Sequence, residues 1–175
     1  MRVIAGESRG RKLVAPEGRD TRPIGDRAKE GIFNMLGGLV DFDGIQVVDL
    51  FAGSGSFGIE CLSRGASHVT FVEQGRPAQA AIAKNLEKLD LTAKATTLRG
   101  SVESVISTLQ PVELAFLDPP YAVDMWSELL ATVDASVVVG HAGFEIPLSS
   151  GWVEQKRRTY GRSHIVIAER ETSLS

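Results

Sequence analysis

The sequence predicts a single α/β domain built on a doubly wound, mostly parallel β-sheet. Short apolar runs alternate with amphipathic stretches, which gives five βα-like units in succession and favours crossovers between parallel strands. Residues 45–51, IQVVDLF, are nearly all apolar, as expected of a central strand covered on both faces. A length of 175 residues suits one well-filled core and is short for two.

The amino-terminal residues predict a small basic hairpin followed by a connector. In residues 1–14, short apolar pairs flank a turn-forming segment from Gly6 to Gly10, with basic side chains on or beside the turn. Residues 16–25 are expected to form an irregular connector. Asp26 is expected to cap a helix that stops at Gly37.

The segment after the central strand predicts a turn that cradles a ligand and leads into a helix. Gly53 and Gly55 can adopt positive φ and leave the backbone open to a bound molecule. Ser56 is well placed to cap a helix whose apolar side chains include Ile59 and Leu62.

The rest of the chain continues the alternation of strands and helices. We expect strands at residues 68–73, 95–99, 114–117 and 135–139, with 144–148 continuing or rejoining the sheet. The spacing of apolar residues predicts helices at 76–89, 102–109 and 125–133. Residues 152–160 and 163–169 predict a closing antiparallel pair.

Two classes of ligand compete for the glycine turn. Gly53, Gly55 and Gly58 spell G-x-G-x-x-G, and Glu73 follows Gly53 by twenty residues, which satisfies the dinucleotide fingerprint. Asp49, however, is expected at the mouth of the turn, where its charge would repel a pyrophosphate. S-adenosylmethionine (AdoMet) has an ammonium and a sulfonium but no phosphate, and its carboxylate suits the N–H groups of a helix start. The pattern favours AdoMet; a turn that merely reverses the chain is the alternative.

Further contacts to the ligand are expected where neighbouring strands end. Asp49 and Glu73 each close a strand of adjacent βα units, so we expect both in one crevice. Glu73 can accept hydrogen bonds from ribose hydroxyls; otherwise it is a surface carboxylate. Ser101 is either a contact for the adenine or only a helix cap.

Residues Asp118-Pro119-Pro120-Tyr121 predict a rigid substrate-binding corner after the fourth strand. The prolines fix φ at about −65° and so hold a carboxylate, a carbonyl and a ring in one geometry. Asp118 and the Pro119 carbonyl can accept both hydrogens of an exocyclic amine. The ring of Tyr121 can stack on the attached base, which is worth about 1–3 kcal/mol. A simple proline turn at a strand end is the structural alternative.

Methyl transfer to such an amine needs alignment of the nitrogen, the methyl group and the leaving sulfur more than activation of a nucleophile. Such positioning can lower the activation barrier by on the order of 7–11 kcal/mol. Hydrogen bonds to Asp118 and Pro119 would favour the pyramidal nitrogen of the transition state. No nucleophilic dyad or metal is required. His68, His141 and His164 are scattered without ligand-like spacing, so we expect no metal site.

Charge is distributed unevenly along the chain. Residues 1–29 contain eight Lys and Arg against four Asp and Glu, residues 30–151 six against fifteen, and residues 152–170 five against two. Basic ends that meet in the fold would form a positive face suited to a polyanion. Ordinary solvated charge is the alternative, above all for residues 156–158.

Composition limits the location of the protein. No apolar run approaches the roughly eighteen residues that would span a bilayer, and the first seven residues turn polar before a signal peptide could form. We therefore expect a cytoplasmic protein without a membrane partner. Cys61 has no second cysteine to pair with and is expected in the core. No exposed apolar stripe is evident, so we expect a monomer without an obligate protein partner.

The motifs Asp49-Leu50-Phe51-Ala52-Gly53-Ser54-Gly55, Phe71-Val72-Glu73 and Leu117-Asp118-Pro119-Pro120-Tyr121 resemble those of class I AdoMet-dependent methyltransferases. More narrowly, residues 2–6, 9–13, 22–30 and 158–161 resemble the RsmD family of guanine-N2 methyltransferases, and the likeness extends over residues 1 to about 170. The resemblance implies a seven-stranded sheet and N2-methylation of one guanine of 16S rRNA, in an assembled or assembling 30S subunit. Ile24-Gly25 and Gly100-Ser101 depart from the family's usual residues, and the second departure bears on the adenine contact.

The resemblance and the residue chemistry together assign three sets of site residues. Cofactor binding is expected from Asp49, Phe51, Ala52, Gly53, Ser54, Gly55, Glu73, Gly100, Ser101 and Val102. Catalysis is expected from Asp118, Pro119, Pro120 and Tyr121, and RNA binding from Arg2, Arg9, Arg11, Lys12, Arg22, Arg27 and Arg158. The corresponding segments are a basic hairpin and connector (1–25), a methyltransferase domain (26–170) and a tail (171–175).

Three other functions compete with this interpretation. An adenine-N6 methyltransferase acting on DNA or RNA would use the same corner, because the corner recognises an amine before it recognises a base. An NAD(P)-binding oxidoreductase would use the same glycine turn. A noncatalytic RNA-binding assembly factor could retain the fold without the reaction.

Overall fold

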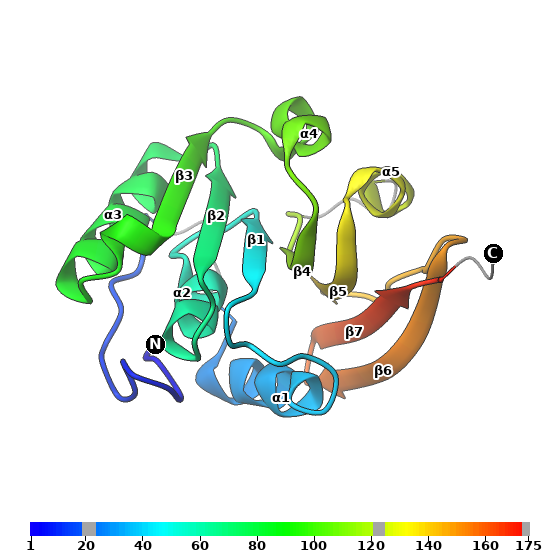
Figure 1. Ribbon diagram of the computed structural model, residues 1–175, viewed down its shortest axis with the longest axis horizontal. Helices are drawn as coiled ribbons and strands as arrows, with labels where there is room; N and C mark the ends of the chain where they lie inside the picture. Colours follow the sequence, from blue (N-terminus) through cyan, green and yellow to red (C-terminus); the bar gives the residue numbers. More distant parts are fainter. Residues whose placement is uncertain (19–23, 121–124, 173–175) are drawn as a thin grey trace.

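The chain folds around one mixed β-sheet with the strand order β3-β2-β1-β4-β5-β7-β6 (Figure 1). The computed structural model describes residues 1–18, 24–120 and 125–172. Within these residues the seven strands are β1 (Gln46–Leu50), β2 (His68–Glu73), β3 (Ala95–Arg99), β4 (Val112–Leu117), β5 (Ala135–Ala142), β6 (Trp152–Tyr160) and β7 (Ser163–Arg170). Strands β1 to β5 are parallel, and β7 pairs antiparallel with β5 and β6. The predicted doubly wound, mostly parallel α/β fold is confirmed.

Helices cover both faces of this sheet (Figure 1). On one face lie α1 (Asp26–Leu36), α2 (Ser56–Ser63) and α3 (Arg76–Lys88), and on the other α4 (Val102–Val105) and α5 (Met125–Thr132). Successive strand residues point to opposite faces, so Val47 packs with the first group of helices and Val48 with the second. No helix within the described residues is both long and apolar enough to cross a lipid bilayer.

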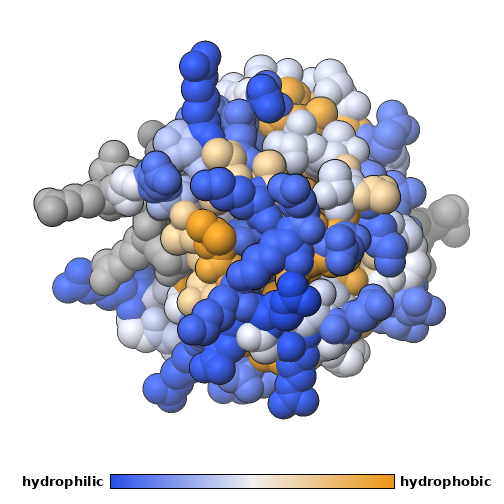
Figure 2. All heavy atoms as spheres, turned by 90° about the vertical axis from the view of Figure 1, so that its left-hand side faces the viewer, coloured by the Kyte–Doolittle hydropathy of each residue, from blue (hydrophilic) through white to orange (hydrophobic). Residues whose placement is uncertain are grey.

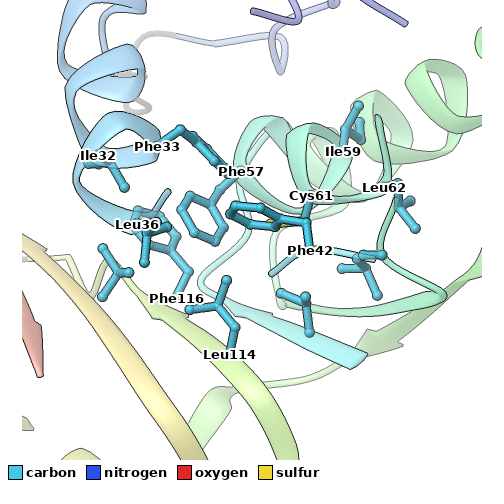
Figure 3. Close-up of a cluster of buried hydrophobic side chains, with 14 of the residues drawn as sticks. Ile32, Phe33, Leu36, Phe42, Phe57, Ile59, Cys61, Leu62, Leu114 and Phe116 are labelled. Carbon is cyan, nitrogen blue, oxygen red and sulfur yellow. The ribbon is translucent and has the colours of Figure 1, made fainter. Parts of the chain in front are cut away.

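Aromatic rings fill the core between the sheet and helices α1 and α2 (Figure 3). Phe57 of α2 stacks on Phe116 of β4, with the ring centroids 3.9 Å apart. Phe33 of α1 lies 5.0 Å from Phe57 and 5.6 Å from Phe42. Cys61 is buried in this cluster, and burial raises the pKa of its thiol, as expected of a core residue.

The amino-terminal segment follows the course of a hairpin that is held by a helix rather than by a strand ladder. Arg2 and Lys12 form a single antiparallel bridge. The carboxylate of Glu60 in α2 accepts hydrogen bonds from the N–H groups of Ile4 and Ala5 at 2.8 and 2.9 Å. The hairpin is therefore short and depends on polar side chains of the main domain.

Two more side chains fasten the hairpin. Ser63, at the end of α2, accepts a hydrogen bond from the N–H of Ser8 at 2.9 Å. Asn85 of α3 accepts one from the N–H of Val14 at 2.7 Å and donates one to the Val14 carbonyl. A Cβ atom on Gly6 would lie 1.8 Å from the carbonyl oxygen of Ser63, so the hairpin turn lies directly against α2.

Two predicted helix caps are wrong by one residue. Gly25 occupies the N-cap of α1, and Asp26 is the first helical residue, where its charge still suits the positive helix end. Gly55, with φ 76°, occupies the N-cap of α2 in place of Ser56. The Ser56 hydroxyl instead accepts a hydrogen bond from the ammonium of Lys29.

Two predicted elements also differ in extent. Residues 144–148 form no strand, and β5 continues to Ala142 instead of ending at residue 139. Because β7 pairs with β5 as far as Ala142, the adjacent place in the sheet is already taken. The helix predicted at 102–109 is a four-residue α4 followed by a short 3-10 helix, Ile106–Thr108.

Candidate active site

Three strands of the sheet end at the same level. The parallel register pairs Leu50 of β1 with Val72 of β2 and with Leu117 of β4. The carboxyl ends of parallel strands form the usual ligand-binding edge of an α/β sheet. Three acidic side chains gather at this edge: Asp49, Glu73 and Asp118.

The turn after β1 has an unusual backbone. Phe51 has φ 62°, a left-handed conformation that costs a residue with a side chain on the order of 1–3 kcal/mol. Gly53 has φ 57°, and a Cβ built on it would meet no atom within 4 Å. By contrast, a Cβ on Gly58 would lie 2.4 Å from the ring of Phe71. Gly58 therefore allows α2 to pack closely on the sheet, while Gly53 leaves backbone open towards a ligand.

Asp49 is buried near the end of β1, directly before the turn. Its side chain is 1% exposed, and Oδ2 accepts a hydrogen bond of 2.9 Å from the N–H of Gly58. Oδ1 is buried and has no hydrogen-bond partner among the described residues. Burial raises the pKa of this carboxyl well above its usual value, against the hydrogen bond from Gly58, and Asp118 and Glu73 raise it further. Repulsion of a pyrophosphate by Asp49 is accordingly a weaker discriminant than the sequence suggested.

Glu73 organises the backbone around the turn. Its Oε2 accepts a hydrogen bond from the N–H of Gly53 at 2.8 Å, and its Oε1 accepts one from the N–H of Gly75 at 2.7 Å. A carboxylate oxygen has two lone-pair sites, so each can accept a second hydrogen bond. The side chain is half-buried, and it could both shape the turn and accept hydroxyl groups of a ligand.

Asp118 follows β4 directly and is paired with a histidine. One of its oxygens, Oδ1, lies 2.9 Å from Nδ1 of His141, and the side chain is 31% exposed. Pro119 is buried, Pro120 is exposed, and Tyr121 lies outside the described residues. Sequence reasoning treated His141 as one of three scattered histidines. The signal that could have found it is the alignment of β4 with β5, which brings the residues after Leu117 and Gly140 side by side.

The predicted adenine side of the site lies between β3 and α4. Ser101 occupies the N-cap position of α4, but its side chain makes no capping hydrogen bond. The N–H of Gly100 donates to the Glu73 carbonyl at 3.3 Å, and Val102 is buried. Gly100 is thus tied to the end of β2, and the Ser101 hydroxyl is not used as a cap.

These features fit AdoMet as a ligand. The unpartnered Oδ1 of Asp49 needs a hydrogen-bond donor, and an ammonium group supplies one. Gly53 offers open backbone, and Glu73 retains acceptor sites for hydroxyls. Phe51, Ala52 and Ser54 belong to the same turn. Within the described part of the chain, no three His, Cys, Asp or Glu side chains are grouped to hold a metal ion.

The predicted RNA-binding residues that the structure describes lie on the hairpin, on α1 and on β6. Figure 2 shows the side of the molecule that carries α3 and the hairpin, and this face is largely hydrophilic. Arg2 forms an exposed ion pair with Asp26 at 3.6 Å, and Arg11 donates to the carbonyl of Lys88. The remaining described members are exposed: Arg9, Lys12, Arg27 and Arg158. Arg22 lies outside the described residues.

Helix α1 contacts both basic ends of the chain. Asp26 at its start pairs with Arg2 of the hairpin. Near its end, the carbonyl of Met35 accepts a hydrogen bond of 2.7 Å from the Lys156 ammonium of β6. The two basic segments therefore both contact one helix.

One hollow of the described surface lies away from this edge. It is a groove of about 780 Å³ at the amino-terminal edge of the strands, with the acidic residues Asp41, Glu113, Asp134, Glu169 and Glu171 among those that line it. Its position is opposite to the edge where the carboxyl ends of β1, β2 and β4 meet. An acidic lining also disfavours a polyanion there.

Comparison with known proteins adds independent information. A family model described as "Conserved hypothetical protein 95" matches residues 1–169. The Bacillus subtilis protein named "Putative rRNA methyltransferase YlbH" is 39% identical over 181 residues, with 95% of this chain and 97% of that protein covered. "Ribosomal RNA small subunit methyltransferase D" of Escherichia coli is 30% identical over 166 residues, with 94% of this chain and 75% of that protein covered.

A solved structure agrees with the sequence matches. The structure of "Putative methyltransferase yhhF from Escherichia coli" superposes with a TM-score of 0.86 at 28% identity. The superposition covers 99% of each chain, so the whole arrangement of sheet, helices and amino-terminal segment is similar in the two proteins.

Proposed function

The chain belongs to the family described as Conserved hypothetical protein 95, and from this premise we propose that it methylates the exocyclic N2 amine of one guanine in 16S rRNA, with AdoMet as the methyl donor. Its seven-stranded sheet has the class I methyltransferase fold, as the sequence predicted. The names of the relatives from B. subtilis and E. coli both refer to methylation of ribosomal RNA. Guanine N2 is the finer part of the proposal and rests on the terminal motifs.

One observation carries the proposal: Asp118 stands at the end of β4, next to the open glycine turn at the end of β1. Asp118 suits recognition of an amine, and the glycine turn suits a nucleoside ligand with an ammonium group. Because the two strands are hydrogen-bonded neighbours, both ligands would meet at one edge. Such an arrangement accelerates methyl transfer mainly by aligning the reactants, which can lower the activation barrier by on the order of 7–11 kcal/mol.

The residues of the turn would hold the donor in the following way. The unpartnered Oδ1 of Asp49 would accept a hydrogen bond from the ammonium, Gly53 would allow backbone contact, and Glu73 would accept hydrogen bonds from ribose hydroxyls. Phe51, Ala52, Ser54, Gly55, Gly100, Ser101 and Val102 complete the proposed binding set. AdoMet would supply a methyl group on a positively charged sulfur, and its carbon–sulfur bond would break as the amine nitrogen forms a bond to the methyl carbon.

The residues of the corner would act on the amine. Asp118 and the Pro119 carbonyl accept the two N–H hydrogens, which orients the nitrogen lone pair and favours its pyramidal form. Pro120 keeps the corner rigid, and Tyr121 stacks on the base. The methylated nitrogen must then release one proton, for which the carboxylate of Asp118 is the adjacent acceptor.

The basic segments would bind the RNA. A guanine has to leave its stack to reach the corner, at a cost of a few kcal/mol. Contacts from the hairpin, α1 and β6 to flanking phosphates offset that cost. In this proposal residues 1–25 serve mainly the RNA, residues 26–170 form the methyltransferase domain, and residues 171–175 are a tail.

The test is methyl transfer with purified components. The protein is incubated with labelled AdoMet and either 30S particles or free 16S rRNA from a strain that lacks the modification, and the labelled nucleoside is mapped. The proposal expects N2-methylguanine at a single position. N6-methyladenine would instead support the adenine alternative, and binding of NADH in preference to AdoMet would support an oxidoreductase.

A variant of Asp118 separates an enzyme from a noncatalytic RNA-binding factor. In Asp118→Ala, methyl transfer should fall by at least about 100-fold, while AdoMet affinity and thermal stability stay close to those of the unmodified protein. Unchanged transfer would remove Asp118 from the proposed reaction.

A further inference from the structure

His141 is brought to Asp118 by the register of the sheet. Leu117 of β4 pairs with Gly140 of β5, so the next residue on each strand is Asp118 and His141. On its other side β5 pairs with β7, where His141 lies opposite Ile165. The backbone that carries the histidine is therefore fixed by hydrogen-bonded strands on both sides, and its Nδ1 lies 2.9 Å from Oδ1 of Asp118.

Packing also prevents this part of β5 from shifting. A Cβ atom on Gly140 would lie 3.0 Å from both Trp126 and Ile146, so the strand has no space to move towards α5. The His141 side chain is 14% exposed, whereas that of Asp118 is 31% exposed. The imidazole is thus the more firmly held member of the pair, and the carboxylate is the member that can reach a substrate.

The two ring nitrogens differ in their surroundings. Nδ1 faces a carboxylate oxygen, which only accepts, so Nδ1 must carry the hydrogen. Nε2 is buried and finds no hydrogen-bond partner among the described residues. A hydrogen on Nδ1 directed at Oδ1 leaves Oδ2 of Asp118 without a partner from this histidine.

We propose that His141 is a positioning residue for Asp118. By donating Nδ1–H to Oδ1, it fixes the plane of the carboxylate and presents Oδ2 to the substrate amine. This inference rests on the proposed function, in which Asp118 accepts a hydrogen bond from that amine. A carboxylate without this partner rotates freely at a partly exposed site, and misplacement by about 1 Å can slow a reaction on the order of 100-fold.

Three substitutions at one position separate positioning from packing. His141→Ala removes the donor, His141→Asn retains an amide donor near the place of Nδ1, and His141→Gln places the amide near Nε2 instead. We expect kcat to fall by about 10- to 100-fold in the alanine and glutamine variants and by less than about threefold in the asparagine variant. The dissociation constant of AdoMet should change by less than about threefold in all three.

Two controls sharpen the test. His68→Ala removes another half-buried histidine, which starts β2 and contacts Thr96 at the strand end away from the candidate active site. This variant should leave kcat unchanged. The double variant with Asp118→Ala and His141→Ala should be no slower than Asp118→Ala alone, because the histidine acts only through the carboxylate.

The inference is overturned if His141→Ala retains kcat within about twofold, or if the asparagine and glutamine variants are equally slow. Thermal unfolding of each variant shows whether it is folded. If the unmodified protein makes no N2-methylguanine, the proposed function has failed, and the pairing is then judged by ¹⁵N NMR of the imidazole. Hydrogen on Nδ1 of His141 that moves to Nε2 in Asp118→Ala supports the pairing; an Nε2–H tautomer in the unmodified protein refutes it.

Discussion

The ammonium nitrogen of Lys29 lies 3.6 Å from a carboxylate oxygen of Glu60, and both side chains are almost wholly excluded from water. Lys29 also donates to the carbonyl of Arg2 at 2.6 Å, so the pair joins α1, α2 and the hairpin. Burial lowers the pKa of the ammonium, against the attraction of Glu60. An ion pair in this position makes each partner costly to remove.

Replacement of Glu60 by alanine should lower the free energy of unfolding by about 3–5 kcal/mol, measured by urea denaturation. The change leaves the charge of Lys29 buried without its counter-charge and takes the acceptor from two hairpin N–H groups. Glu87→Ala, at an exposed position of α3, is the control and should change stability by less than about 0.5 kcal/mol. A loss below about 1 kcal/mol for Glu60→Ala would contradict a structural role for the pair.

Asp49→Asn should stabilise the protein increasingly as the pH rises. The pKa of Asp49 is raised above 3.8, so the folded protein retains a proton that the unfolded chain releases. The stability that this group contributes is complete below pH 3.8 and is lost as the pH rises through the raised pKa. Asparagine has no such proton to lose, so the variant should gain stability relative to the unmodified protein as the pH rises through the raised pKa.

Urea denaturation of both proteins between about pH 4 and about pH 8 measures this difference. A difference that stays constant over that range would show that the carboxyl is not perturbed. The same variant should bind AdoMet more weakly at every pH, because the proposed acceptor for the ammonium is changed.

Alanine at Gly53 and at Gly58 should have different effects. Gly58→Ala forces a methyl group against the ring of Phe71 and should lower stability by about 1–3 kcal/mol. In Gly53→Ala the new methyl group meets no atom, so stability should fall only by the cost of a positive φ at alanine, about 1 kcal/mol. The methyl group obstructs the open backbone, however, and should weaken AdoMet binding at least about tenfold. Thermal unfolding and calorimetric titration measure the two effects. If Gly53→Ala and Gly58→Ala weakened AdoMet binding equally, the result would argue against a ligand at Gly53.

Alanine replacements of Arg9, Arg11 and Lys12 together should weaken RNA binding and its salt dependence. Each lost phosphate contact reduces the slope of log affinity against log salt by about 0.7–0.9. The affinity for AdoMet should not change, because these residues lie on the hairpin and not at the glycine turn.

A matched control changes the same charge at exposed positions of α3 and the turn that follows it, with alanine at Arg76, Lys84 and Lys94. Filter binding at several salt concentrations compares the two triple variants. If both lose the same affinity, RNA binding depends on overall charge and the hairpin has no special role.

Features encoded by local sequence were predictable. The central strand and the glycine turn are recognisable because a buried parallel strand is apolar on both faces and because positive φ favours glycine. The cap of α2 was misplaced by one residue because Gly55 takes a left-handed conformation there, which a serine at the next position does not reveal. Roles of individual site residues remain predictions.

Features that depend on distant pairing were not predictable. The extension of β5 to Ala142 follows from its pairing with β7, and the contact between His141 and Asp118 follows from the register of β4 with β5. A local sequence pattern encodes neither the extent of β5 nor this contact, because both depend on how a strand aligns with a neighbour that is distant in the sequence. Similarly, the apolar residues at 144–148 suggested a strand, but the neighbouring place in the sheet is occupied by β7.

The attachment of the hairpin has a consequence for the order in which the molecule assembles. Ile4, Ala5 and Val14 are held by side chains that lie 56, 55 and 71 residues further along the chain. Contacts over such separations form slowly, because a long loop has to close first. The hairpin is therefore expected to be among the last segments to settle. Pulsed hydrogen exchange during refolding should find the amides of Ile4 and Val14 protected later than those of β2, which pairs with β1 over 22 residues and with β3 over 26.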